Sequence, residues 1–233
     1  RELAEEWDNV GLLVGDPAAP LRVVRTCLTL TPDVVDEAIA GNVSLVVTHH
    51  PLPFRGVKSI TTDSTEGASL WRLAQAGIAV YSPHTAYDSA TAGVNQQWAD
   101  RLGLTATRPL CPALDRTDGA GAGRIGRWTG GDFASLAASV KRLTNQSVVR
   151  VVTPRVAAHG DGKVGPEHNH GAWVAIACGS GGSLLDPAVR ARCDVFLTGE
   201  MSFHECLRCR SLGVGVILTG HYASERFAVE TLA

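Results

Sequence analysis

Imidazole and carboxylate side chains stand directly after four apolar, strand-like runs of this sequence. They are His49 and His50, His84 and Asp88, Glu200 and His204, and His221 and Glu225. The other histidines lie in one polar loop at 159–170. In open α/β sheets, ligands bind beyond the carboxyl ends of the strands. We therefore predict that the side chains after the four runs gather there and form a site.

The spacing within these groups indicates how they could bind metal ions. His221 and Glu225 are four residues apart, so they face the same way if a helix begins at His221. His49 and His50 are adjacent after a strand and are expected to point to opposite sides, which suits two neighbouring ions. Neutral imidazole is the commonest metal ligand, and a carboxylate adds negative charge.

The number of potential ligands favours a dinuclear site. Three histidines and two carboxylates exceed the four-ligand shell of a structural zinc ion. They fit two ions roughly 3.5–4 Å apart with a water or hydroxide between them. Such a ligand set suits Zn, Mn, Fe, Co or Ni and leaves the identity of the metal open. Taken singly, His84 or His204 could instead be a hydrogen-bonded turn residue.

Strands and helices alternate along the chain, which predicts an α/β fold with largely parallel sheets flanked by helices. Expected strands are 23–30, 44–48, 78–82, 124–129, 147–152, 172–178, 194–198 and 214–219. Expected helices begin at 31 and 224 and cover 64–76, 93–102, 133–143, 186–192 and 203–212. The composition shifts to Pro, Asp, Gly and Ala between 107 and 123. We predict a first lobe at 1–110, a linker at 111–123 and a second lobe at 124–233.

Composition narrows the classes of partner. The 233 residues are 45% hydrophobic and carry a net charge of −2 with no run of Lys and Arg, so we expect neither nucleic acid nor an anionic membrane surface as a partner. No apolar run approaches the ~20 residues of a membrane span. The six dispersed cysteines favour free thiols and a cytoplasmic protein. Cys206 and Cys209 form a C-x-x-C that fits two core thiols or a redox or zinc pair. The chain starts without Met and stops within an expected helix, so we treat it as a fragment.

Three further features each admit two interpretations. Trp7-Asp8-Asn9 fits a helix-to-strand turn anchored by the indole, or a place at the edge of the site. The turn 179–183, GSGGS, could be tight packing or an anion-binding wall. Arg55 and Lys58 could add positive charge for an anionic substrate or could be solvated loop residues.

Five motifs fall in order across nearly the whole chain. They are EEWDNVGLLVGDP (5–17), VVTHHPLPF (46–54), SPHTAYDSATAGVN (82–95), DVFLTGEMSFH (194–204) and ILTGHYASER (217–226). Together they resemble the NGG-interacting-factor-three-like family, whose members are often labelled GTP cyclohydrolase type 2 or dinuclear metal-binding proteins. The chain resembles the short form of the family, without an inserted middle domain.

The resemblance implies a ligand set, a fold and an assembly. The metal ligands it implies are His49, His50, Asp88, His221 and Glu225, which the spacing also selects. His84 would then act outside the ligand shell or in proton transfer, and Glu200 and His204 would line the cavity. The family fold implies two similar, interlocked α/β lobes and a homo-oligomer, commonly a hexameric ring.

These expectations favour a metal-dependent hydrolase that attacks a phosphoester or nucleotide-like substrate through a metal-bridging hydroxide. His84, or Glu200 with His204, would carry the proton. The alternative is a non-catalytic metal-handling or regulatory interaction protein. A third, weaker possibility is a nucleotide-binding module built on the turn 179–183.

Overall fold

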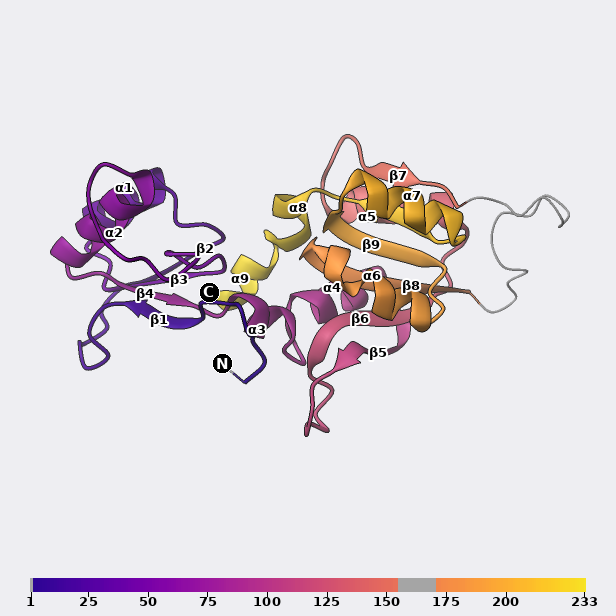
Figure 1. Ribbon diagram of the computed structural model, residues 1–233, viewed down its shortest axis with the longest axis horizontal. Coiled ribbons are helices and arrows are strands. Elements are labelled where there is room, and N and C mark those ends of the chain that lie inside the picture. Colours follow the sequence, from indigo (N-terminus) through magenta and orange to yellow (C-terminus); the bar gives the residue numbers. More distant parts are fainter. Residues whose placement is uncertain (1, 155–170) are drawn as a thin grey trace, which may run out of the picture. The chain divides into compact units, whose positions relative to one another are not determined.

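The computed structural model describes residues 2–154 and 171–233, and the predicted polar loop at 159–170 lies outside them. The chain divides into two compact units, which are described separately. Unit 1 comprises Arg1–Tyr87 and Arg226–Ala233, and unit 2 comprises Asp88–Glu225. Both are mixed α/β with a sheet and flanking helices (Figure 1), which confirms the predicted fold class.

Unit 1 contains a four-stranded sheet in the order β1-β4-β3-β2. Its strands are β1 (Gly11–Val14), β2 (Val24–Cys27), β3 (Leu45–Thr48) and β4 (Ala79–Ser82). Its helices are α1 (Pro32–Ala40), α2 (Thr65–Gln75) and α9 (Ala228–Leu232), and α3 (His84–Asp88) begins in it. Strands β2, β3 and β4 are parallel, and β1 pairs antiparallel with β4. The three parallel strands therefore end at the same edge of the sheet.

Helices α1 and α2 of unit 1 begin where the sequence signals predict. Pro32 occupies the first turn of α1, where its missing N–H costs nothing. The Ser64 hydroxyl accepts the N–H of Gly67 at the start of α2. Val46 and Val80 from the strands pack with apolar residues of both helices to form the core of this unit.

Unit 2 contains a six-stranded sheet in the order β5-β6-β8-β9-β10-β7. Its strands are β5 (Thr105–Pro112), β6 (Gly121–Trp128), β7 (Arg150–Val152), β8 (Ala172–Ser180), β9 (Val195–Glu200) and β10 (Gly215–Leu218). Among the described strands of unit 2, only β8–β9 and β9–β10 pair in parallel. The β5–β6, β6–β8 and β10–β7 pairs are antiparallel. The expectation of largely parallel sheets is therefore right for unit 1 and wrong for unit 2.

Helices cover both faces of the unit 2 sheet. They are α4 (Val94–Leu102), α5 (Phe133–Leu143), the 3-10 turn η1 (Gly181–Leu184), α6 (Leu185–Arg190), α7 (Phe203–Ser211) and α8 (His221–Glu225). Leu185 of α6 and Cys209 of α7 join one core with Ala175 of β8. Helix α4 packs against β6 and β8. Because neighbouring residues of a strand point to opposite faces, Ile176 is buried on the side away from Ala175. No helix in the described ranges is both long and apolar enough to span a membrane.

The predicted linker 111–123 is part of a β-hairpin. It contains the end of β5, the connecting turn and the start of β6, and the N–H of Ala113 donates to the carbonyl of Ala120 at 3.0 Å. Pro109 and Pro112 made the β5 segment resemble a linker in the sequence. Proline is tolerated in an edge strand, and β5 lies at the edge of its sheet. The division at 87/88 and 225/226 therefore differs from the predicted boundaries at 110 and 124.

Candidate functional site

Unit 1 gathers three histidines at the carboxyl ends of its parallel strands. His49 and His50 follow β3, and His84 follows β4 as the first residue of α3. One ring nitrogen from each of the three lies within 4.8 Å of the others. The ring centroid of His49 is 5.1 Å from that of His50 and 5.4 Å from that of His84. Three imidazoles at this separation can share metal ions.

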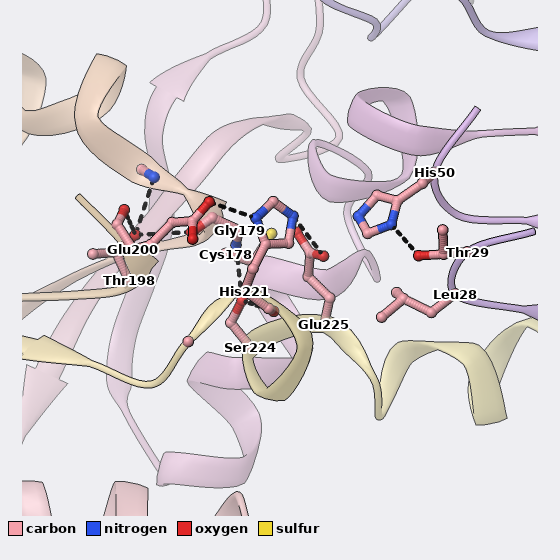
Figure 2. A network of polar contacts seen from close by, with 12 residues as sticks. Leu28, Thr29, His50, Cys178, Gly179, Thr198, Glu200, His221, Ser224 and Glu225 are labelled. Carbon is pink, nitrogen blue, oxygen red and sulfur yellow. Dashed lines mark hydrogen bonds and ion pairs between the residues drawn. The ribbon is translucent and has the colours of Figure 1, made fainter. Parts of the chain in front are cut away.

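Backbone hydrogen bonds fix the adjacent pair to the end of the neighbouring strand. The N–H of His49 donates to the carbonyl of Cys27 at 3.0 Å, and that of His50 donates to Leu28 at 2.9 Å. The Nδ1 atom of His50 lies 2.7 Å from the Thr29 hydroxyl, as Figure 2 shows. The two rings lie beside each other rather than on opposite sides, because the chain turns after Thr48 and no longer alternates as a strand does. The prediction that they point apart is wrong.

A buried carboxylate holds the third histidine. The Nδ1 atom of His84 lies 2.7 Å from Oδ1 of Asp8, whose side chain is fully buried. The other oxygen of Asp8 accepts the N–H of Thr85 at 3.1 Å and also the hydroxyl of Thr85. In the neutral imidazole this contact places the proton on Nδ1 and leaves Nε2 with a lone pair. His84 has φ of 31°, a conformation that costs about 1–3 kcal/mol and that the surrounding contacts must maintain.

Unit 2 places one histidine between two carboxylates. His221 begins α8 after β10, and its Nε2 atom lies 3.2 Å from Oε2 of Glu225 at the end of the same helix. Its Nδ1 atom lies 2.9 Å from Oε1 of Glu200, which ends β9. Figure 2 shows the His221 ring between Glu200 and Glu225. The hydrogen bond that the His221 ring donates to Glu225 is the main cause that raises the pKa of His221 to about 9, and Glu200 adds to this effect.

The end of β8 brings further groups to this half-site. The buried thiol of Cys178 lies near the carboxylates of Asp88 and Glu225, and burial together with those two charges raises its pKa well above the ordinary value. Gly179 has φ of +62°, and a Cβ atom there would lie 2.3 Å from Oε1 of Glu225 and 3.3 Å from Nε2 of His221. A glycine at 179 therefore makes room for the acidic and imidazole donors.

Helix α4 ties together the segments that carry these donors. The Nδ2 group of Asn95 donates to the carbonyl of Asp88 at 3.2 Å, and its Oδ1 atom accepts the N–H of Cys178 at 2.8 Å. The indole N–H of Trp98 donates to the carbonyl of Ser224 at 2.7 Å. Asn95, Trp98 and Ser224 are all buried. One helix face thus fixes Asp88, the end of β8 and α8.

Two backbone N–H groups of the turn 179–183 donate hydrogen bonds to side chains of the protein. The N–H of Gly179 donates to the Ser224 hydroxyl at 2.9 Å, and that of Gly181 donates to the Thr198 hydroxyl at 3.1 Å. A Cβ atom at Gly181 would also lie 2.4 Å from Oγ1 of Thr198. Of the two interpretations of this turn, the contacts favour tight packing over an anion-binding wall.

Within each unit, the structure brings together most of the predicted site residues. His49, His50 and His84 cluster in unit 1, and His221 contacts Glu200 and Glu225 in unit 2. His204 instead lies exposed on α7 with its ring 5.7 Å from that of Phe203. Sequence reasoning singled out Trp7-Asp8-Asn9 and the turn 179–183 but gave Asp8 and Gly179 no contact with the predicted site residues. It missed the other supporting residues, namely Thr29, Asn95, Trp98, Cys178 and Ser224.

The donors of each unit fit a divalent metal ion. Unit 1 offers imidazole nitrogens, and unit 2 offers an imidazole with carboxylates, which are ligands of zinc and the neighbouring transition metals. The Nδ1 atoms of His50, His84 and His221 contact the Thr29 hydroxyl and the carboxylates of Asp8 and Glu200, respectively. Proteins orient metal-ligating imidazoles by such contacts on the second ring nitrogen. The groups of each unit are thus of the kind that can hold a metal ion.

Comparisons with known proteins place this chain among named relatives. The family model described as Duf34/NIF3 (NGG1p interacting factor 3) matches residues 1–233. The chain is 35% identical to the protein NIF3 homolog of Schizosaccharomyces pombe, over 97% of this chain and 80% of that protein. It is 33% identical to the GTP cyclohydrolase 1 type 2 homolog of Lactococcus lactis, over 97% of this chain and 82% of that protein.

Solved structures share the fold. A Bacillus cereus protein related to NIF3 superposes with a TM-score of 0.82 at 22% identity, over 100% of this chain and 88% of the other. Staphylococcus aureus protein SA1388 gives a TM-score of 0.81 at 27% identity, over 99% of this chain and 85% of the other. The sequence resemblance is thereby confirmed, and the chain belongs to the Duf34/NIF3 (NGG1p interacting factor 3) family.

Proposed function

We propose that this chain binds two divalent metal ions and acts as a metal-dependent hydrolase on a phosphoester or nucleotide-like substrate. The proposed ligands are His49, His50, Asp88, His221 and Glu225. The observation that carries the proposal is the cluster of imidazole nitrogens in unit 1, all within 4.8 Å of one another at the ends of parallel strands. Neutral imidazole is the commonest metal ligand in proteins, so three ring nitrogens this close together support a metal site.

The unit 2 donors supply what the histidine cluster lacks. Imidazoles are neutral when they bind metal, so a pair of divalent ions held by them alone would keep its full charge. Asp88 and Glu225 add two negative charges.

When bound, a pair of divalent ions lowers the pKa of a water molecule and stabilises the negative charge that develops on a phosphoryl oxygen. The metal identity stays open among Zn, Mn, Fe, Co and Ni. Relatives named GTP cyclohydrolase 1 type 2 homologs make a purine nucleotide one substrate to test.

The residues around the ligands have separate roles in this proposal. His84 carries a proton, because its Nδ1 atom is held by Asp8 while Nε2 can accept or donate. Glu200 holds His221 in orientation through Nδ1, a positioning role rather than proton transfer. His204 is exposed on α7 and receives no role.

Turnover by metal-reconstituted protein tests the proposal. A panel of phosphomonoesters, phosphodiesters and nucleotides, GTP included, should contain a substrate whose hydrolysis stops with chelator. The Asp88→Ala variant should lose that activity, and the matched control Asp63→Ala, at an exposed acid outside the site, should keep it.

Two results would count against the hydrolase. Metal that binds without turnover of any panel member favours the metal-handling or regulatory alternative. Nucleotide binding that survives chelation, without turnover, favours a binding module. We also propose a homo-oligomer, with a hexameric ring as the expected form, and light scattering of the purified chain measures its mass.

A further inference from the structure

Two exposed aromatic side chains stand beside the histidine cluster of unit 1. We propose that Trp7 and Phe54, called here the aromatic wall, bind a planar heteroaromatic ring of the substrate by stacking. The inference names the substrate class of the proposed hydrolase, so it rests on the proposed function. It goes beyond that function by assigning binding residues that are neither metal ligands nor proton carriers.

The aromatic wall and His84 form a nearly equilateral triangle of rings. The ring centroids of Trp7 and Phe54 are 5.9 Å apart, with an interplanar angle of 35°. The centroid of His84 lies 6.0 Å from that of Trp7 and 5.9 Å from that of Phe54, and both contacts are edge-on. The His50 ring is in turn 5.8 Å from that of His84. The wall is therefore one ring away from the proposed ligands.

Two segments distant in sequence are joined to build the wall. The Nδ2 group of Asn9 donates to the carbonyl of Pro53 at 2.8 Å, which ties the residue after Asp8 to the residue before Phe54. Asp8, the neighbour of Trp7, contacts His84 and Thr85. Hydrogen bonds on both segments hold the wall before any ligand arrives, and such preorganisation lowers the entropic cost of binding.

Exposure separates this pair from the core aromatics. Trp7 is 60% exposed and Phe54 is 44% exposed, whereas Trp98 is 2% exposed. A rigidly held aromatic pair that stays open to solvent, next to buried polar side chains, is typical of a binding surface rather than of core packing. Trp71 on α2 is also exposed, at 47%, and has no ring contact with the histidine cluster among those the structure shows. It serves as the internal control.

The ligand class follows from the aromatic wall and from the histidine cluster beside it. Aromatic faces stack with any planar π-system, and they discriminate little among bases. The histidines and the proposed cations favour an anionic group. A molecule that carries a planar nitrogen heterocycle at one end and a phosphate at the other satisfies both, and a nucleoside phosphate is of this class.

Calorimetric titration with AMP and with ribose 5-phosphate isolates the contribution of the ring. We use the full chain, as purified and again after chelation, which stops metal-dependent turnover. The wild type should bind AMP at least about tenfold more tightly than ribose 5-phosphate. Trp7→Leu and Phe54→Leu should each remove most of that difference, Trp7→Phe should retain part of it, and Trp71→Leu should leave it unchanged.

Equal affinity for the two probes, including no binding of either, would overturn the proposal. An equal loss in Trp71→Leu would do the same. Metal content of each variant separates this inference from the proposed function. Ring-dependent binding in a chain that holds no metal would support the aromatic wall and refute the proposed metal-dependent hydrolase. Metal-dependent hydrolysis with no preference for the ring would support the hydrolase and refute the aromatic wall.

Discussion

The two units share an arrangement of strands and helices but differ in the side chains around their histidines. Each has three parallel strands in sequence order, β2-β3-β4 in unit 1 and β8-β9-β10 in unit 2. In each, the third strand is followed by a one-turn helix that begins with histidine and ends with an acid four residues later. These helices are α3 (His84–Asp88) and α8 (His221–Glu225).

The surroundings of the two histidines are opposite in character. His84 lies beside two more imidazoles and is held by a buried acid. His221 lies between two carboxylates, one of which, Glu200, is 56% exposed. One scaffold thus presents neutral nitrogen donors in unit 1 and anionic oxygen donors in unit 2. The strong nitrogen ligands therefore predominate in unit 1 and the negative charge in unit 2.

Substitution of Gly179 by alanine should have the largest effect, and it acts on unit 2. The new Cβ atom would lie 2.3 Å from Oε1 of Glu225, at φ of +62°. We expect a loss of about 2–5 kcal/mol in the free energy of unfolding, with loss of bound metal. Gly213→Ala, at φ of +76° with nothing within 4 Å, is the control and should cost only about 1–2 kcal/mol. Equal effects in urea denaturation would show that the contact with Glu225 is unimportant.

Removal of the Trp98 indole N–H should loosen α8 next. Trp98→Phe leaves the buried carbonyl of Ser224 without its donor, which costs about 1–3 kcal/mol, and the smaller ring adds a cavity. Trp71→Phe, at an exposed tryptophan, should stay within about 0.5 kcal/mol of wild type. Denaturation curves measure both, and a Trp98 variant as stable as the Trp71 variant would contradict the proposed anchoring.

The two carboxylates that contact Nδ1 of a histidine should affect different measurements. Asp8→Asn removes a buried charge from His84, the proposed proton carrier, and should lower turnover by roughly 100-fold while metal binding stays close to wild type. Glu200→Gln changes a solvent-exposed partner of His221, a proposed ligand, and should weaken metal binding by less than about tenfold. Competition with a chromogenic chelator measures the affinities, and the hydrolysis assay measures turnover. A loss of metal affinity in Asp8→Asn that exceeds the loss in Glu200→Gln would contradict these roles.

The smallest effect concerns the pH dependence of the chelated protein. The pKa of His221 is raised to about 9, chiefly by Glu225, so protonated His221 stabilises the folded state. That contribution is complete below the unfolded pKa of about 6.5 and is lost as pH rises through about 9. Urea denaturation between pH 6 and 10 should show this loss in wild type and a flatter profile in Glu225→Gln. Identical profiles would contradict the assignment.

The sequence predicted the proposed metal ligands better than the residues that hold them in place. His49 and His221 were found because each follows an apolar run, and that order along the chain survives in the fold. The contact between Asp8 and His84 spans 76 residues, and that between Trp98 and Ser224 spans 126. No local periodicity encodes contacts at such separations, so these pairings could not be predicted.

The strand pattern shows the same limit. Parallel pairing in unit 1 followed from alternating strands and helices, because such a crossover returns the chain in the same direction. In unit 2, Pro109 and Pro112 made β5 resemble a linker, and the turn before β6 completed that impression. Only pairing with β6, a tertiary feature, identifies β5 as a strand.

Metal stoichiometry of ligand variants tests the central claim most directly. Elemental analysis of reconstituted protein should find about two divalent ions per chain in wild type. His50→Ala in unit 1 and Glu225→Ala in unit 2 should each lower that number, because each removes a proposed ligand. A wild type that holds no stoichiometric metal, or a variant of either unit that keeps both ions at full affinity, would contradict the account.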